Sequence, residues 1–103
     1  MIIAIPSEGE DINSPISKVF ARAPYFIIYD SEANTYRVVH NPEEAIAGPG
    51  ATERVIAEGT VMVIANKMGR YSLKALRDNG IEVITGARGT CWGAIEKYRS
   101  RIK

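Results

Sequence analysis

The chain has 103 residues, of which 46% are apolar and 24% are charged. This length and balance are typical of one folded globular domain and exclude a disordered chain, so we expect a single domain over residues 1–103. Thirteen basic and twelve acidic side chains leave a net charge of +1, which gives no bulk attraction to nucleic acid or to an anionic membrane. The single cysteine excludes an intrachain disulfide and an all-cysteine zinc site.

The first half of the chain predicts one central strand followed by a β-hairpin. Residues 2–5 are apolar on both faces, as in a strand that helices cover on both sides. Residues 25–29 and 35–39 have strand composition and flank a turn-rich linker at 30–34, which is typical of a hairpin. The stretch 7–24 has neither periodicity, and a loop of this length in a small domain is usually functional or partly mobile.

Helices and strands alternate in the second half of the chain. The expected elements are, in chain order, a helix at 52–58, a strand at 61–65, a helix at 71–79, a strand at 81–84, and a helix from the N-cap Thr90 toward Lys103. Such alternation implies right-handed crossovers and parallel pairing, and the hairpin adds an antiparallel strand. The predicted fold is a three-layer α/β/α sandwich with a mixed five-stranded sheet.

Several motifs resemble one known family. The most specific are MIIAIP at 1–6, NSPIS at 13–17, FARAPYF at 20–26 and the Tyr29-Asp30 pair. Weaker matches continue through His40-Asn41-Pro42, the glycines at 48, 50 and 69, and the segments 75–81 and 86–90. Together they span nearly the whole chain. They resemble the dinitrogenase iron–molybdenum cofactor biosynthesis family, which includes NifX-like and NafY-like carriers and the C-terminal part of NifB.

The resemblance implies a ribonuclease-H-like fold with sheet order 3-2-1-4-5 and strand 2 antiparallel. It also implies a carrier for an iron–molybdenum or other metal–sulfur cluster, with metallocluster-assembly proteins as partners. The chain departs from the family at two positions where members often carry a histidine, because it reads Lys18-Val19-Phe20-Ala21 at the first and Gly48-Pro49-Gly50 at the second. Both departures remove potential metal ligands.

The carboxyl ends of parallel strands meet at one edge of a sheet, where ligands of open α/β sheets bind. In the predicted topology this edge also collects the first residues of the three helices and the start of the second strand. Helix N-termini and basic side chains attract anions, so we predict an anion-binding site there. The candidate binding residues are Ser7, Arg22, His40, Asn66, Lys67, Gly69, Arg70, Gly86, Arg88, Gly89 and Thr90.

His40 and Cys91 are the candidate metal ligands, and each is the only residue of its type in the chain. The alternative for His40 is a polar residue that stabilises a turn, and the alternative for Cys91 is a buried, inert thiol on the core side of its helix. Nuclease chemistry of the ribonuclease-H type needs clustered carboxylates on the first and fourth strands. It is excluded, because 2–5 and 61–65 contain no acidic residue.

The leading hypothesis is a non-enzymatic carrier that holds an anionic metal–sulfur cluster, or a precursor of one, at this edge. Two alternatives stay open: a regulatory or scaffolding module that has lost its metal ligands, and a small-anion or nucleotide-binding protein. The N-terminal stretch lacks the basic region and the cleavage site of a signal peptide, which predicts a cytoplasmic protein. We expect a monomer or a weak homodimer with no nucleic-acid or membrane partner.

Overall fold

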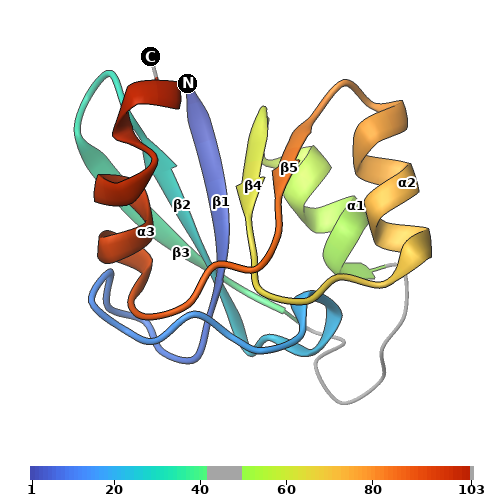
Figure 1. The fold of residues 1–103 in the computed structure, drawn as a ribbon, viewed down its shortest axis with the longest axis horizontal. Helices are drawn as coiled ribbons and strands as arrows, with labels where there is room; N and C mark the ends of the chain where they lie inside the picture. The colour runs from blue at the N-terminus through green and yellow to red at the C-terminus, as the bar shows by residue number, and fades with distance from the viewer. Residues whose placement is uncertain (42–49, 103) are drawn as a thin grey trace.

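A mixed sheet of five strands in the order β3-β2-β1-β4-β5 forms the middle layer of the structure (Figure 1). The computed structural model describes residues 1–41 and 50–102. The strands are β1 Ile2–Ser7, β2 Tyr25–Asp30, β3 Thr35–His40, β4 Met62–Ile64 and β5 Glu82–Ile84. β2 is antiparallel to both β1 and β3, whereas β4 is parallel to β1 and to β5. The predicted fold class and strand order are confirmed.

The helices cover both faces of this sheet. α1 (Gly50–Ala57) and α2 (Arg70–Asp78) pack on one face, and α3 (Cys91–Lys97) packs on the other (Figure 1). Two short 3-10 helices, η1 (Phe20–Arg22) and η2 (Arg99–Arg101), lie before β2 and after α3. None of the helices in the described ranges has the length and apolar character that crossing a membrane requires.

The last helix is shorter than the sequence predicts. α3 ends at Lys97 and gives way to η2 instead of continuing toward Lys103. Arg101 forms an ion pair with Glu82 at the start of β5, and Ile102 packs against the core. Both contacts involve residues at the end of η2, the 3-10 helix that stands in place of the expected last turns of α-helix.

Other boundaries differ by one or two residues. Val61 is 44% exposed and precedes β4, because only residues 62–64 pair with the neighbouring strands. β1 continues to Ser7, which pairs with Tyr25 of β2. α1 begins at Gly50 rather than at residue 52, and the predicted Gly48 and Pro49 before it lie outside the described residues.

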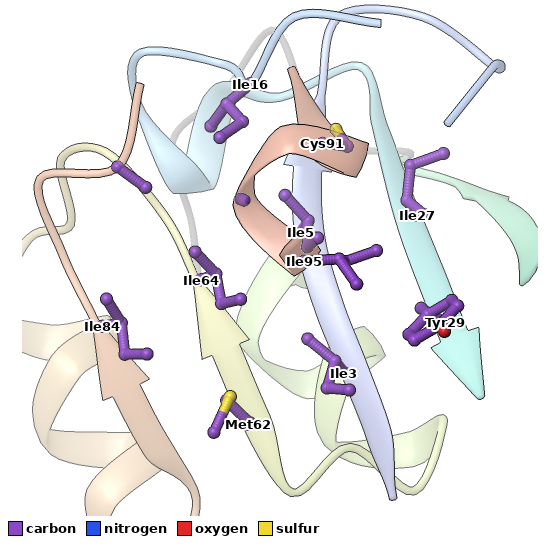
Figure 2. Packing of buried hydrophobic residues seen from close by; sticks show 12 residues of the cluster. Ile3, Ile5, Ile16, Ile27, Tyr29, Met62, Ile64, Ile84, Cys91 and Ile95 are labelled. Carbon is purple, nitrogen blue, oxygen red and sulfur yellow. The ribbon is translucent and has the colours of Figure 1, made fainter. Parts of the chain in front are cut away.

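Both faces of the central strands are buried, which explains their continuous apolar sequences. Ile3 and Ile5 of β1 belong to the same cluster as Cys91 and Ile95 of α3 (Figure 2), whereas Ala4 belongs to the cluster under α1 and α2. Burying a side chain as large as isoleucine stabilises a fold by roughly 1.5–3 kcal/mol relative to leaving it exposed. The packed sheet therefore gives the loops at its carboxyl edge a fixed frame.

Residues 8–24, which we call the crossing segment, run along this edge of the sheet and are tied down by backbone hydrogen bonds. The N–H groups donate to carbonyls in three distant parts of the chain: Ile16 to Gly89 at 2.9 Å, Ser17 to Pro6 at 2.9 Å and Phe20 to Lys67 at 3.0 Å. A mobile loop would leave such groups to water. These hydrogen bonds make the crossing segment a strap that joins β1 to the segments after β4 and β5, and they favour an ordered segment over a mobile one.

We expect the amide protons of Ile16, Ser17 and Phe20 to exchange with solvent slowly, at rates close to those of the central strands. The physical reason is that opening any of these bonds requires the strap to lift from the sheet edge. Glu10, an exposed residue of the same segment, is the internal control, and its amide should exchange fast. Hydrogen exchange followed by NMR would measure this, and equally fast exchange at all four amides would show that the crossing segment is mobile after all.

Candidate functional site

The edge formed by the carboxyl ends of β1, β3, β4 and β5 carries the site residues that the sequence predicts. Ser7, Tyr25 and His40 are aligned across β1, β2 and β3 by the strand register. The connections from β4 to α2 and from β5 to α3 leave the sheet along the same edge, beside the crossing segment (Figure 1). The predicted convergence of these chain segments is therefore present in the fold.

One hollow at this edge has a strongly basic lining. Its volume is about 630 Å³, within the size range of small-molecule sites. Lys18, Lys67 and Arg88 supply three positive charges, and none of the lining residues is acidic. We call it the basic hollow; it is lined by Pro15, Ile16, Lys18, Asn66, Lys67, Arg88, Gly89 and Thr90.

Backbone pairing holds the three cationic residues together although they are distant in the sequence. The N–H of Lys67 donates to the carbonyl of Lys18 at 3.0 Å, which places these two lysines side by side. On the opposite side, Gly89 accepts from the N–H of Ile16, and Pro15 pairs with Thr90. The crossing segment thus forms one wall of the hollow.

Gly89 has φ +92°, a left-handed conformation that glycine adopts without strain. A Cβ built at this position would meet no other atom within 4 Å. Glycine is therefore favoured here by the backbone conformation and not by a lack of space. The turn through Gly89 lies between Arg88, which lines the basic hollow, and the helix that starts after Thr90.

Arg22 lines a second hollow of about 360 Å³ that adjoins the first. The two hollows share Pro15, Ile16 and Lys18 as lining residues. The second one also contains the Glu8 carboxylate, which accepts a hydrogen bond from the Ser17 hydroxyl. A negative charge in this hollow makes it a weaker site for an anion than the basic hollow.

The N-terminal amides of α3 are not available to a ligand, contrary to the sequence-based expectation of free helix N–H groups. Cys91 N donates to Ser14 O at 3.0 Å, Trp92 N donates to Ile12 O at 2.8 Å, and Gly93 N donates to the Thr90 hydroxyl at 3.0 Å. The positive potential at the basic hollow therefore comes from side chains rather than from this helix end.

Comparisons with known proteins agree with this architecture. A sequence model of the dinitrogenase iron–molybdenum cofactor family matches residues 1–101. The chain belongs to this family. A search among curated proteins gave no match.

Three solved structures are similar to this one along nearly the whole chain. A candidate NifB protein from Thermotoga, determined by NMR, is 36% identical, with a TM-score of 0.83 over 96% of this chain and 87% of that one. The crystal structure of PH0822 is 30% identical, with a TM-score of 0.85 over 98% of this chain and 92% of that one. The apo orange protein from Desulfovibrio gigas is 20% identical, with a TM-score of 0.90 over 97% of this chain and 88% of that one, which shows a shared fold alone.

Five of the predicted binding residues in this iron–molybdenum cofactor family member meet at the basic hollow, and the others do not line it. Gly69 and Arg70 form the start of α2, and Gly86 makes a turn in which its N–H donates to Asn66 O at 2.8 Å. Ser7 is fully buried, with its hydroxyl donating to Gly9 O at 2.7 Å. Burial removes Ser7 from contact with a ligand, because β1 extends to this residue and carries it under α3. The five that meet are Asn66, Lys67, Arg88, Gly89 and Thr90.

The two candidate metal ligands occupy different environments. His40 lies on the edge strand β3, where its ring packs edge-on against Tyr25 at a centroid distance of 5.4 Å. Cys91, the first residue of α3, is fully buried in the core between this helix and the sheet. Across residues 1–41 and 50–102, no three or more His, Cys, Asp or Glu side chains gather as a metal site would require. Of the two readings for Cys91, the buried thiol is the one that its surroundings favour.

Burial raises the pKa of the Cys91 thiol from 9.0 to about 11, and the neighbouring Ser7 hydroxyl offsets only part of this rise. Between these pH values the unfolded thiol loses its proton while the folded one keeps it, so the unfolded state binds fewer protons. We therefore expect the free energy of unfolding to fall as pH rises through this interval, by at most about 1.4 kcal/mol per pH unit from this group. At pH values well below 9.0, where both states keep the proton, the group contributes no slope.

Urea unfolding on both sides of pH 9.0 would measure this effect. The variant Cys91→Ala is the control, because it lacks the thiol and should show a shallower loss of stability above this pH. Parallel pH profiles for the two proteins would contradict a buried, neutral thiol.

Lys18 is the charged lining residue that the sequence did not predict as a binding residue. It lies in a stretch without periodicity, and its position depends on hydrogen bonds between backbone groups far apart in the chain. A lysine ammonium has no free lone pair, so Lys18 favours attraction of an anion over coordination of a metal.

Proposed function

We propose that the protein is a non-enzymatic carrier that holds an anionic metal–sulfur cluster, or a precursor of one, in the basic hollow. The observation that carries this proposal is the meeting of Lys18, Lys67 and Arg88 around one hollow whose lining contains no carboxylate. Membership of the dinitrogenase iron–molybdenum cofactor family supports a cluster of this kind as the cargo. The donors and acceptors of that cargo would be other metallocluster-assembly proteins.

The chemistry of the lining determines how such a cargo would be held. Lysine and arginine side chains form charge-assisted hydrogen bonds with anions, and Asn66 and Thr90 add neutral donors. Cys91, the one thiol of the chain, is buried with a raised pKa, so a metal–thiolate bond is disfavoured. We therefore expect the cluster to be held by its charge and to enter and leave without the breaking of a bond to the protein.

The same lining supports a carrier rather than a catalyst. Thiolates, imidazoles and carboxylates are the commonest nucleophiles and general acids or bases, whereas a lysine or a threonine needs an activating neighbour for either role. The basic hollow is lined by cations, an amide, a hydroxyl, aliphatic groups and a glycine. These groups bind and orient an anion.

Binding of tetrathiomolybdate under anaerobic conditions tests the proposal. Equilibrium dialysis should show retention of the coloured anion, with an affinity that falls as the salt concentration rises, because exposed charges are screened. Retention that does not respond to salt would contradict binding by charge. Absence of retention would favour the scaffolding alternative over the carrier.

A further inference from the structure

Another hollow, on the α3 face of the sheet, has no part in the proposed carrier function. Among the α-helices of the described residues, α3 alone packs on this face of the sheet, whereas α1 and α2 share the other. Tyr36 on the edge strand β3 is left 39% exposed. Beside it is an open pocket of about 280 Å³, which we call the aromatic pocket; it is lined by Ile12, Asn13, Tyr29, Asn34, Tyr36 and Trp92.

Three aromatic rings from three different elements form this pocket. Tyr29 of β2 and Tyr36 of β3 are direct cross-strand partners. Trp92 of α3 lies with its ring centroid 6.2 Å from that of Tyr29, at an interplanar angle of 76°. Tyr29 is buried, so its ring is fixed by packing, while Trp92 is partly exposed. The pocket thus presents aromatic surface in a fixed arrangement.

Two asparagines add polar groups to the rim. The Tyr29 hydroxyl donates to Asn34 Oδ1 at 2.7 Å, which orients the Asn34 amide and leaves its Nδ2 group as a donor. Asn34 has φ +54°, which fixes its place in the hairpin turn. Within the described residues, the side-chain amide of Asn13 has no hydrogen-bond partner in the protein. Both amides can therefore pair with a ligand.

A positive charge lies next to the same rings. The guanidinium carbon of Arg99 is 5.5 Å from the centroid of the Trp92 ring. Stacking of Arg99 on the indole holds this cation beside the pocket. An anionic group attached to a bound ring would find a partner there.

We propose that the aromatic pocket binds the base of a nucleotide. Purine and pyrimidine rings stack on aromatic side chains, and asparagine amides pair with the donor and acceptor groups on their edges. The pocket volume suits one ring system rather than a large ligand, and Arg99 would attract the phosphate. This site is separate from the basic hollow, which shares none of its lining residues.

The protein carries its own reporter for this site, because Trp92 is its only tryptophan. Adenosine 5′-monophosphate and uridine 5′-monophosphate should quench the tryptophan fluorescence in a saturable way. Tyr36→Ala should weaken the binding about fivefold or more, since it removes a stacking surface. Tyr36→Phe keeps the ring and should retain the binding. Asn34→Gly, which tolerates the positive φ, should weaken it by removing the amide.

Matched controls separate this proposal from others. Tyr71→Ala removes a 62% exposed tyrosine from α2 on the other face and should leave the nucleotide response unchanged. Lys67→Ala should reduce tetrathiomolybdate binding and leave the nucleotide response intact, which distinguishes failure of one site from failure of the other. A short oligonucleotide that quenches far more strongly than the mononucleotides would identify single-stranded nucleic acid as the source of the base.

Three results would overturn the proposal. One is no saturable quenching by either mononucleotide. A second is equal quenching by ribose 5-phosphate, which lacks a base. The third is equal weakening by Tyr36→Ala and by Tyr71→Ala, which would mean that the aromatic pocket is not the binding site.

Discussion

Replacement of Lys67 by alanine is expected to weaken the binding of tetrathiomolybdate roughly tenfold to a hundredfold. A charge-assisted contact contributes about 1.5–3 kcal/mol, and Lys67 lies in the lining of the basic hollow next to Lys18. The side chain is exposed, so the free energy of unfolding should change by no more than about 0.5 kcal/mol. Equilibrium dialysis and thermal unfolding of the same samples would measure both quantities.

Two further variants test whether the loss of affinity is specific to the basic hollow. Lys74→Ala removes an exposed lysine of α2 that pairs with Asp78 and should alter neither quantity, because a surface ion pair contributes little. Arg22→Ala should have a smaller effect on affinity than Lys67→Ala, since Arg22 lines the adjoining hollow that also contains Glu8. A loss of stability in Lys67→Ala with unchanged affinity would make Lys67 a structural residue and contradict the carrier proposal.

The layers of the fold could be predicted from the residues, because a strand that is buried on both faces has apolar residues at successive positions. β1 and β4 are covered on both faces, and the chain there is apolar at successive positions. The hairpin of β2 and β3 was visible from the turn-forming residues around Asn34, whose positive φ the structure shows. The order of the strands came from the family resemblance, since residue patterns do not specify which strand lies beside which.

The candidate site was predictable only in part, because its geometry depends on backbone groups. Asn66, Lys67 and Arg88 follow strand ends, and the topology alone brings strand ends together. The path of the crossing segment depends on N–H and carbonyl groups that every residue has, so no side-chain pattern marks it. For this reason the sequence did not predict that Lys18 lines the basic hollow. Nor did it predict that the first N–H groups of α3 donate to carbonyls of the crossing segment.

Truncation of Phe20 to alanine is expected to destabilise the protein by about 3–5 kcal/mol, the usual cost of removing a buried aromatic ring. Phe20 is fully buried and lies with its ring centroid 5.3 Å from that of Phe26. Domains of this kind have a total stability of about 5–15 kcal/mol, so the loss is a large share of it. Urea unfolding would measure the change.

The same substitution should also weaken anion binding, because Phe20 anchors the wall of the basic hollow. Its N–H donates to Lys67 O at 3.0 Å, and Lys18 precedes it by two residues. Phe20→Leu is the matched control: it keeps a large apolar side chain at this position, should cost less stability than Phe20→Ala and should leave the affinity near its original value. If Phe20→Ala remains folded and binds tetrathiomolybdate as tightly as Phe20→Leu, then the crossing segment does not position the cations. The basic hollow would in that case depend on the segments after β4 and β5 alone.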